Sequence, residues 1–336
     1  PSLADRSPRV SNQEAIVTDH SSNFRRVLCA IDFSEASQRA LEASLRMTDG
    51  RVLVVHVLDI PHYVSPRMLG PLGGEGARPL SDIARQDADQ RLAKSLQELE
   101  AAVPGARERL DTQILLGSPA DAILRFSASH KADLIVIGTG QATVRKLLLG
   151  RVANRVIRGG PCPVLTVPPT GLSALRRLLV ATDFSEAATT ALRVAAQLAS
   201  RENGAVEVLH VGPSPLVVPP EVAVGAPSAD PLLGSPGTVG APMTWLEISQ
   251  RVAQEEMAQL QRQAEEEGIT IDKCHVDFGN PAAKILELLE RERFDLVAMG
   301  TQGRRGLAHL MLGSVAESVI HHAQVPVLVT HRPADD

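Results

Sequence analysis

The stretch LLVATDFSEAATTAL at residues 178–192 decides the fold, because the chain carries it twice. The earlier copy reads VLCAIDFSEASQRAL at residues 27–41. In each copy a short apolar run, typical of a strand, leads into a segment whose apolar residues recur at helical spacing. Strand followed by helix is the unit from which open parallel sheets are built. The duplication therefore predicts two such units in one chain.

Four more blocks repeat in the same order, about 150 to 160 residues apart. They are VLVVHV and VEVLHV (52–57 and 206–211), LLGSPADAIL and DFGNPAAKIL (115–124 and 277–286), ADLIVIGTG and FDLVAMGTQG (132–140 and 294–303), and CPVLTVP and VPVLVTH (162–168 and 325–331). The period is too long for a solenoid unit and predicts two copies of one domain. Several of the strand-like runs are nearly all apolar, as in strands covered on both faces. We expect the α/β class, with two doubly wound, Rossmann-like or flavodoxin-like domains, each a five-stranded parallel sheet in the order 3-2-1-4-5.

Changes in composition set the expected boundaries. Residues 1–22 are polar and predict a disordered tail. Residues 23–168 and 176–333 are the two expected domains, joined by a short linker at 169–175. The second domain carries an insert at 212–243, rich in Pro and Gly, which predicts irregular structure. A surface loop and a flap over the binding edge of the sheet both fit this insert.

The composition excludes several classes of protein. The 336 residues are 44% hydrophobic and 22% charged, as in soluble globular domains. A formal net charge of -5 and only 2% aromatic residues argue against a nucleic-acid partner. No apolar run reaches the roughly 18 residues that span a bilayer, and the N-terminal stretch lacks the apolar core of a secretory signal. We therefore expect no membrane partner. The three cysteines have no Cys-x-x-Cys spacing, so we expect no zinc site and a cytoplasmic protein.

A ligand site is expected at the carboxyl ends of the strands, where the strand order reverses. The first and fourth strands of each copy flank that point. The first strand ends at Asp32 or Asp183, and the fourth ends at Gly138 or Gly300. Each aspartate also precedes a helix, so helix capping explains it as well as ligand binding does.

The loop after the fourth strand of the second copy has the pattern of a phosphate-binding loop. Gly300 and Gly303 leave the strand, and Gly313 and Ser314 open the next helix. Glycine lets backbone N–H groups approach an anion, and a helix N-terminus carries partial positive charge. Ser314 is predicted to cap this helix, and Arg304 would add charge. A tight strand-to-helix turn without a ligand is the alternative.

These motifs resemble those of the universal stress protein family in its tandem, UspA-like form. The resemblance rests on ATDFSEAATTAL, VLHV, FGNPAAKIL and DLVAMGTQGRRGLAHLMLGSVAESVI. ATP-binding members carry Gly-x2-Gly-x9-Gly-Ser/Thr, and the second copy fits that spacing in full. The resemblance implies ATP in the crevice and leaves open whether Mg²⁺ accompanies it. The implied binding residues are Thr182, Asp183, Val211, Met299, Gly300, Gln302, Gly303, Arg304, Gly313, Ser314 and Val315.

The first copy departs from this pattern. One residue is deleted between its first two loop glycines, and Arg151 stands where the second copy has Ser314. The arginine either fills the anion site itself or grips a phosphate. We expect ATP binding in the first copy to be weakened or absent. The residues of this weaker second site would be Asp32, Val57, Gly138, Gly140, Gly150 and Arg151.

The resemblance implies an ATP-binding sensor or signalling protein of the stress response, with the nucleotide in the second domain. It also implies that the fifth strands pair within one chain as an internal pseudo-dimer, and it leaves a homodimer open. No catalytic residue stands out, and slow ATP hydrolysis is left open. The alternative is a non-nucleotide ligand-binding or scaffold protein of the stress response. The chain lacks the Gly-x4-Gly-Lys-Ser/Thr loop of P-loop NTPases, and the absence of a Ser-Gly-Gly-rich loop after the first strand disfavours an ATP-pyrophosphatase.

Overall fold

The computed structural model describes residues 24–59, 80–140, 150–213, 245–301 and 312–331. The expected tail at 1–22 and nearly all of the expected insert at 212–243 lie outside the described residues. We call the part up to residue 167 the first half and the part from residue 177 onward the second half.

Helices and strands alternate along both halves. The first half contains β1 (Arg26–Ile31), α1 (Glu35–Met47), β2 (Arg51–Leu58), α2 (Leu80–Ala102), the short 3-10 helix η1 (Arg107–Arg109), β3 (Leu110–Leu116), α3 (Pro119–Ser129), β4 (Leu134–Gly138), α4 (Arg151–Gly159) and β5 (Val164–Val167). The second half contains β6 (Arg177–Thr182), α5 (Glu186–Ser200), β7 (Ala205–Gly212), α6 (Trp245–Glu266), β8 (Lys273–Phe278), α7 (Pro281–Arg291), β9 (Leu296–Gly300), α8 (Ser314–His322) and β10 (Val327–Thr330).

The strands form one ten-stranded sheet in the order β3-β2-β1-β4-β5-β10-β9-β6-β7-β8. Each half therefore has the predicted order 3-2-1-4-5, and within each half all neighbouring strands are parallel. The halves join where β10 runs antiparallel to β5, with Val327 opposite Thr166 and Val329 opposite Val164. This contact confirms that the fifth strands pair within one chain. A homodimer stays a prediction.

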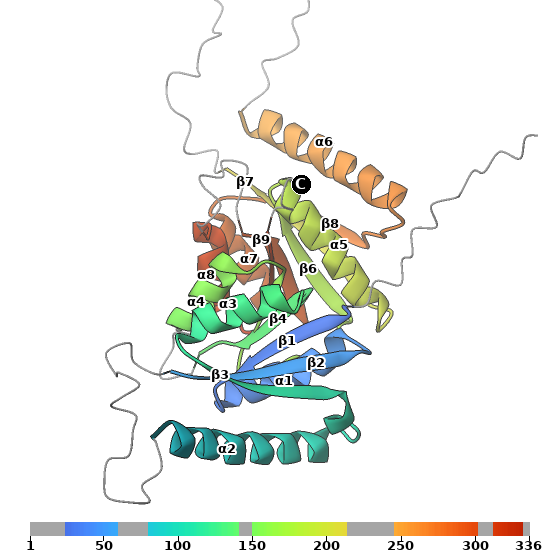
Figure 1. The fold of residues 1–336 in the computed structure, drawn as a ribbon. Helices are drawn as coiled ribbons and strands as arrows, with labels where there is room; N and C mark the ends of the chain where they lie inside the picture. The colour runs from blue at the N-terminus through green and yellow to red at the C-terminus, as the bar shows by residue number, and fades with distance from the viewer. Residues whose placement is uncertain (1–23, 60–79, 141–149, 214–244, 302–311, 332–336) are drawn as a thin grey trace, which may run out of the picture.

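Helices cover both faces of the sheet and bury a separate apolar core on each. Helices α1, α2, α5 and α6 contribute to one core, and α3, α4, α7 and α8 contribute to the other. Figure 1 shows α2 and α6 at opposite ends of the molecule, with α3, α4 and α8 gathered near its middle. The inner strands β1, β4, β9 and β10 are almost wholly buried, which explains why their sequences are apolar at successive positions.

Polar contacts also tie the two halves together. Arg201, the residue directly after α5, forms an ion pair with Asp49, at 2.7 Å between Nη2 and Oδ1. Arg46 of α1 forms a second pair with Glu202 at 3.0 Å. His331, just after β10, hydrogen-bonds through Nε2 to the Ile157 carbonyl of α4 at 2.7 Å. Glu202 and His331 of the second half thus contact helices α1 and α4 of the first half. The halves are held together by more than the β5–β10 pairing.

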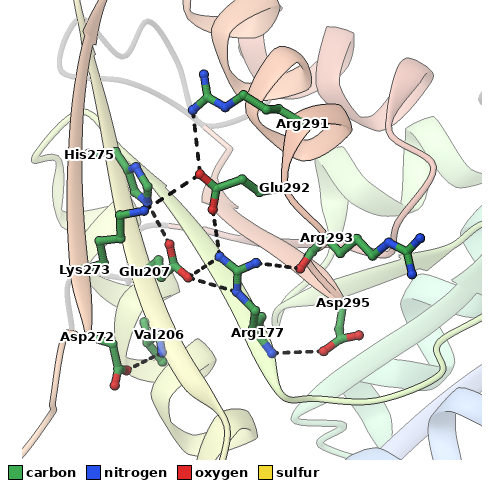
Figure 2. Close-up of polar contacts among 10 residues, drawn as sticks. All are labelled: Arg177, Val206, Glu207, Asp272, Lys273, His275, Arg291, Glu292, Arg293 and Asp295. Atoms are coloured by element: carbon green, nitrogen blue, oxygen red, sulfur yellow. Dashed lines mark hydrogen bonds and ion pairs between the residues drawn. The ribbon is translucent and has the colours of Figure 1, made fainter.

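A cluster of charged side chains lies at the amino ends of β6, β7 and β8, away from the carboxyl ends of the strands (Figure 2). Its centre is Glu207, whose side chain is only 7% exposed. Arg177 donates two hydrogen bonds to one carboxylate oxygen of Glu207, at 3.0 Å from Nε and 2.6 Å from Nη2. His275 contacts the other oxygen through Nε2 at 2.7 Å. The first half has Leu53 at the matching strand position, so this cluster belongs to the second half.

Replacing Glu207 with glutamine is expected to reduce the loss of stability in acid. Burial alone raises the pKa of Glu207, but hydrogen bonds from His275 and Arg177 outweigh it, and the pKa lies below its ordinary value of 4.5. A carboxyl with a lowered pKa stabilises the fold above its unfolded pKa, and this contribution disappears as pH falls through the folded pKa. Between about pH 5 and pH 3, the free energy of unfolding should fall more steeply in the wild type than in Glu207→Gln. Urea unfolding at each pH measures this, and parallel curves would contradict the role given to Glu207.

Candidate functional site

A cavity of about 290 Å³ opens at the carboxyl ends of β6, β7 and β9, and we call it the second crevice. This volume is at the lower end of the range for small-molecule pockets. Its lining residues are Ala181, Thr182, Asp183, Leu209, Val211, Pro281, Ile285, Met299, Gly300, Thr301, Gly313, Ser314, Val315 and Ala316. Eight predicted site residues are therefore brought together, namely Thr182, Asp183, Val211, Met299, Gly300, Gly313, Ser314 and Val315. The other three, Gln302, Gly303 and Arg304, lie outside the described residues.

Asp183 lies in the turn between β6 and α5. Its Oδ1 accepts a hydrogen bond from the Ser185 backbone N–H at 3.1 Å. Ser185 is the residue that caps α5, because its Oγ accepts from the Ala188 N–H at 3.3 Å. The first half repeats this arrangement with Asp32 and Ser34. The aspartates therefore brace the turn, while the serines cap the helices.

The turn after each aspartate is held in an unusual backbone conformation. Phe184 has φ of 60° and Phe33 has φ of 65°, in the left-handed region that non-glycine residues seldom adopt. Each ring packs against a histidine, with ring centroids 4.5 Å apart for Phe184 and His210. The Nδ1 of His210 donates to the Thr182 carbonyl at 2.9 Å, since a carbonyl can only accept. Strained turns held by several contacts are common at binding sites, and sequence patterns gave no sign of this one.

The N-terminus of α8 forms the wall of the second crevice that faces this turn. Ser314 was expected to cap α8, and that expectation is wrong: the N-cap is Gly313, and its φ of -64° and ψ of 146° are extended. Ser314 is already helical, so its hydroxyl cannot make the capping bond and is exposed at the mouth of the crevice. The N–H groups of Ser314, Val315 and Ala316 are the first three of the helix and have no partner within it. This end of α8 suits an anion.

Gly300 and Gly138 are required by packing as well as by the site. A Cβ on Gly300 would lie 2.8 Å from Ala187 Cβ, because the first turn of α5 crosses the end of β9. A Cβ on Gly138 would lie 2.5 Å from the Ala36 carbonyl carbon and 2.6 Å from the Ser37 nitrogen of α1. The loop motif explains these glycines by the turn after the strand, with or without a bound anion. The close helix crossing is a second reason, visible only once α1 and α5 are placed.

The first half has its own cavity at the corresponding place, of about 370 Å³, and we call it the first crevice. All six residues predicted for the weaker site line it, namely Asp32, Val57, Gly138, Gly140, Gly150 and Arg151. The N-cap of α4 is Gly150, and Arg151 is its first helical residue, with an exposed side chain. The first turn of α4 contains no acidic residue. A cation there opposes the helix dipole, so Arg151 makes this crevice chemically unlike the second one.

The lowered pKa of Asp32 agrees with its bonding in the turn. Burial on its own raises the pKa of this carboxyl, but hydrogen bonds from Ser34 and Ser37 hold it below the ordinary value. Asp32 is therefore ionised at neutral pH. It places a negative charge at the edge of the first crevice, which Arg151 also lines.

Within the described residues, no helix is both long and apolar enough to cross a membrane. No group of three or more His, Cys, Asp or Glu side chains in that part of the chain is placed to hold a metal ion.

Comparison with known proteins identifies the family. The model of the universal stress protein family matches residues 23–168 and again residues 174–331. A universal stress protein of Methanocaldococcus jannaschii is 31% identical over 184 residues, which cover 54% of this chain and 91% of that protein. One from Mycobacterium bovis is 26% identical over 248 residues, or 70% of each chain. The crystal structure of a universal stress protein from Archaeoglobus fulgidus shares the fold, with a TM-score of 0.63 and 22% identity over 91% of this chain and 98% of that one. With its family model matched twice, the chain belongs to the universal stress protein family.

Proposed function

We propose that this protein binds ATP in the second crevice and acts as a sensor or signalling protein of the stress response in the cytoplasm. The observation that carries the proposal is the N-terminus of α8, whose first residues line a cavity that Asp183 also lines. A helix N-terminus attracts phosphate, and a carboxylate at the other side can accept hydrogen bonds from ribose hydroxyls. In this proposal the first crevice belongs to a domain of residues 23–168, and the second crevice belongs to a domain of residues 176–333.

The described lining fits the parts of a nucleotide. Leu209, Val211, Ile285 and Met299 supply an apolar floor that suits a flat adenine ring. The phosphates would extend toward Gly313, Ser314 and Val315.

Gln302, Gly303 and Arg304 belong to the proposed site through the sequence motif alone. If Mg²⁺ accompanies ATP, the Ser314 hydroxyl at the phosphate end of the proposed site could be a ligand of the ion.

Titration calorimetry tests the proposal directly. Wild-type protein should bind one ATP per chain, because Arg151 alters the anion end of the first crevice. Binding of two equivalent ATP molecules would contradict the proposed difference between the crevices, and no binding would contradict the function.

A second candidate is a non-nucleotide ligand-binding or scaffold protein. It is favoured by the first crevice, which is the larger of the two and is lined mostly by apolar side chains such as Val55, Ile123 and Ile137. Native mass spectrometry of the purified chain separates the candidates. An apolar or peptide adduct without nucleotide supports the second candidate, and an ATP adduct supports the first.

A further inference from the structure

Thr330 ends β10, and its side chain is completely buried. Its Oγ1 donates a hydrogen bond to the Ala187 carbonyl at 2.7 Å, and the Met299 carbonyl lies 3.5 Å away. Ala187 is in the first turn of α5, directly after the turn that holds Asp183. The Thr330 hydroxyl therefore ties the end of the sheet to the wall of the second crevice that contains Asp183.

The backbone of Thr330 reaches the other wall of the same crevice. Its carbonyl accepts from the Thr301 N–H at 2.8 Å, and the Thr301 carbonyl accepts from the Gly313 N–H at 2.7 Å. Gly313 is the N-cap of α8, so two hydrogen bonds connect Thr330 to the proposed phosphate end. A single residue thus contacts the aspartate wall through its side chain and the phosphate wall through its backbone.

The first half keeps only part of this arrangement. Val167 occupies the position of Thr330, so the hydroxyl is missing, although the Thr139 N–H still donates to the Val167 carbonyl at 2.9 Å. Among the described residues, no backbone hydrogen bond joins Gly150 to Thr139 as Gly313 joins Thr301. The first crevice is also larger, at about 370 Å³ against 290 Å³. The larger crevice is the one without the hydroxyl.

We propose that Thr330 is a positioning residue of the second crevice. It holds the first turn of α5 and the N-cap of α8 at a fixed separation, so that Asp183 and the N–H groups of α8 meet one ligand together. This inference rests on the proposed ATP site, and it names the residue that preorganises that site. A site held in its bound geometry gains affinity because less conformational freedom is lost on binding.

The test replaces Thr330 with valine, which keeps the shape and removes the hydroxyl. ATP affinity measured by calorimetry should fall about tenfold, which corresponds to the loss of one hydrogen bond at the site wall. Thr330→Ser keeps the hydroxyl and should stay within about threefold of the wild type. The matched control is Thr166→Val, since Thr166 is equally buried and its Oγ1 donates to the Val327 carbonyl at 3.1 Å, between the halves. This control should leave ATP affinity unchanged.

A second measurement separates positioning from general stability and needs no nucleotide. Hydrogen exchange followed by mass spectrometry should show faster exchange in residues 186–192, the start of α5, in Thr330→Val, and unchanged exchange there in Thr166→Val. A purely structural role would make the two valine variants behave alike in affinity and in local exchange, and that result would overturn the proposal. If the wild type fails to bind ATP while the local exchange still differs, the proposed function fails and the positioning of the first turn of α5 by Thr330 stands.

Discussion

Gly313→Asp is expected to weaken ATP binding at least about 100-fold, a loss of roughly 2.7 kcal/mol. Aspartate is a favoured N-cap residue, so its carboxylate would accept hydrogen bonds from the N–H groups of the first turn of α8. The same groups would bind the phosphates in the proposed site. The added negative charge would also repel the phosphates across a short distance.

The fold should tolerate this change, so that the loss of binding can be interpreted. The backbone of Gly313 is in an extended region open to any residue, and among the described residues a new Cβ would come nearest to the Thr301 carbonyl oxygen, at 3.1 Å. A circular dichroism melt should therefore match that of the wild type. Calorimetry with ATP then measures the site alone.

The matched control is Gly150→Asp at the N-cap of α4. Gly150 has φ of -60° and ψ of 152°, and a Cβ there would meet no atom of the described residues within 4 Å. ATP affinity should stay within about twofold of the wild type, because the proposed nucleotide is in the other crevice. If Gly150→Asp abolishes binding and Gly313→Asp does not, the two crevices have been assigned the wrong way round.

Gly138→Ala is expected to lower the free energy of unfolding by about 3 kcal/mol, the upper part of the usual range for overpacking. The new methyl group would lie 2.5 to 2.7 Å from backbone atoms of Ala36 and Ser37. Backbone cannot rotate away as a side chain can, so α1 would have to move off β4. That movement would disturb the core that α1 shares with the sheet.

Gly150→Ala provides the comparison for this stability prediction. It adds the same methyl group in open space, and its cost should be about 1 kcal/mol or less, since alanine is a poorer N-cap than glycine. Gly300→Ala should fall between the two, because its nearest contact is the Ala187 methyl group at 2.8 Å. Urea unfolding measures all three variants. Equal losses for Gly138→Ala and Gly150→Ala would contradict the close crossing of α1 over β4.

The repeat was enough to predict the order of the strands, and the family resemblance implied the pairing of the fifth strands. Apolar runs and loop glycines can be read from sequence, and the general right-handedness of parallel connections then gives the strand order. The same reasoning brought Asp183 and Gly313 to one crevice, and the resemblance added Val211 and Met299; all four line the cavity.

Features that depend on how the elements cross could not be read from sequence. The N-cap of α8 is Gly313 and not Ser314, because the helix begins one residue earlier than the motif suggests. Thr330 carried no signal, since its hydroxyl matters only because α5 passes over the end of β10. The left-handed turn at Phe184 was equally hidden, because phenylalanine does not favour that conformation.

The most direct measurement is a crystal structure of the protein grown with ATP. The account predicts electron density for one nucleotide per chain in the second crevice, with its phosphates at the N-terminus of α8 and its ribose beside Asp183. Density for ATP only in the first crevice, or in neither crevice at saturating ATP, would contradict it.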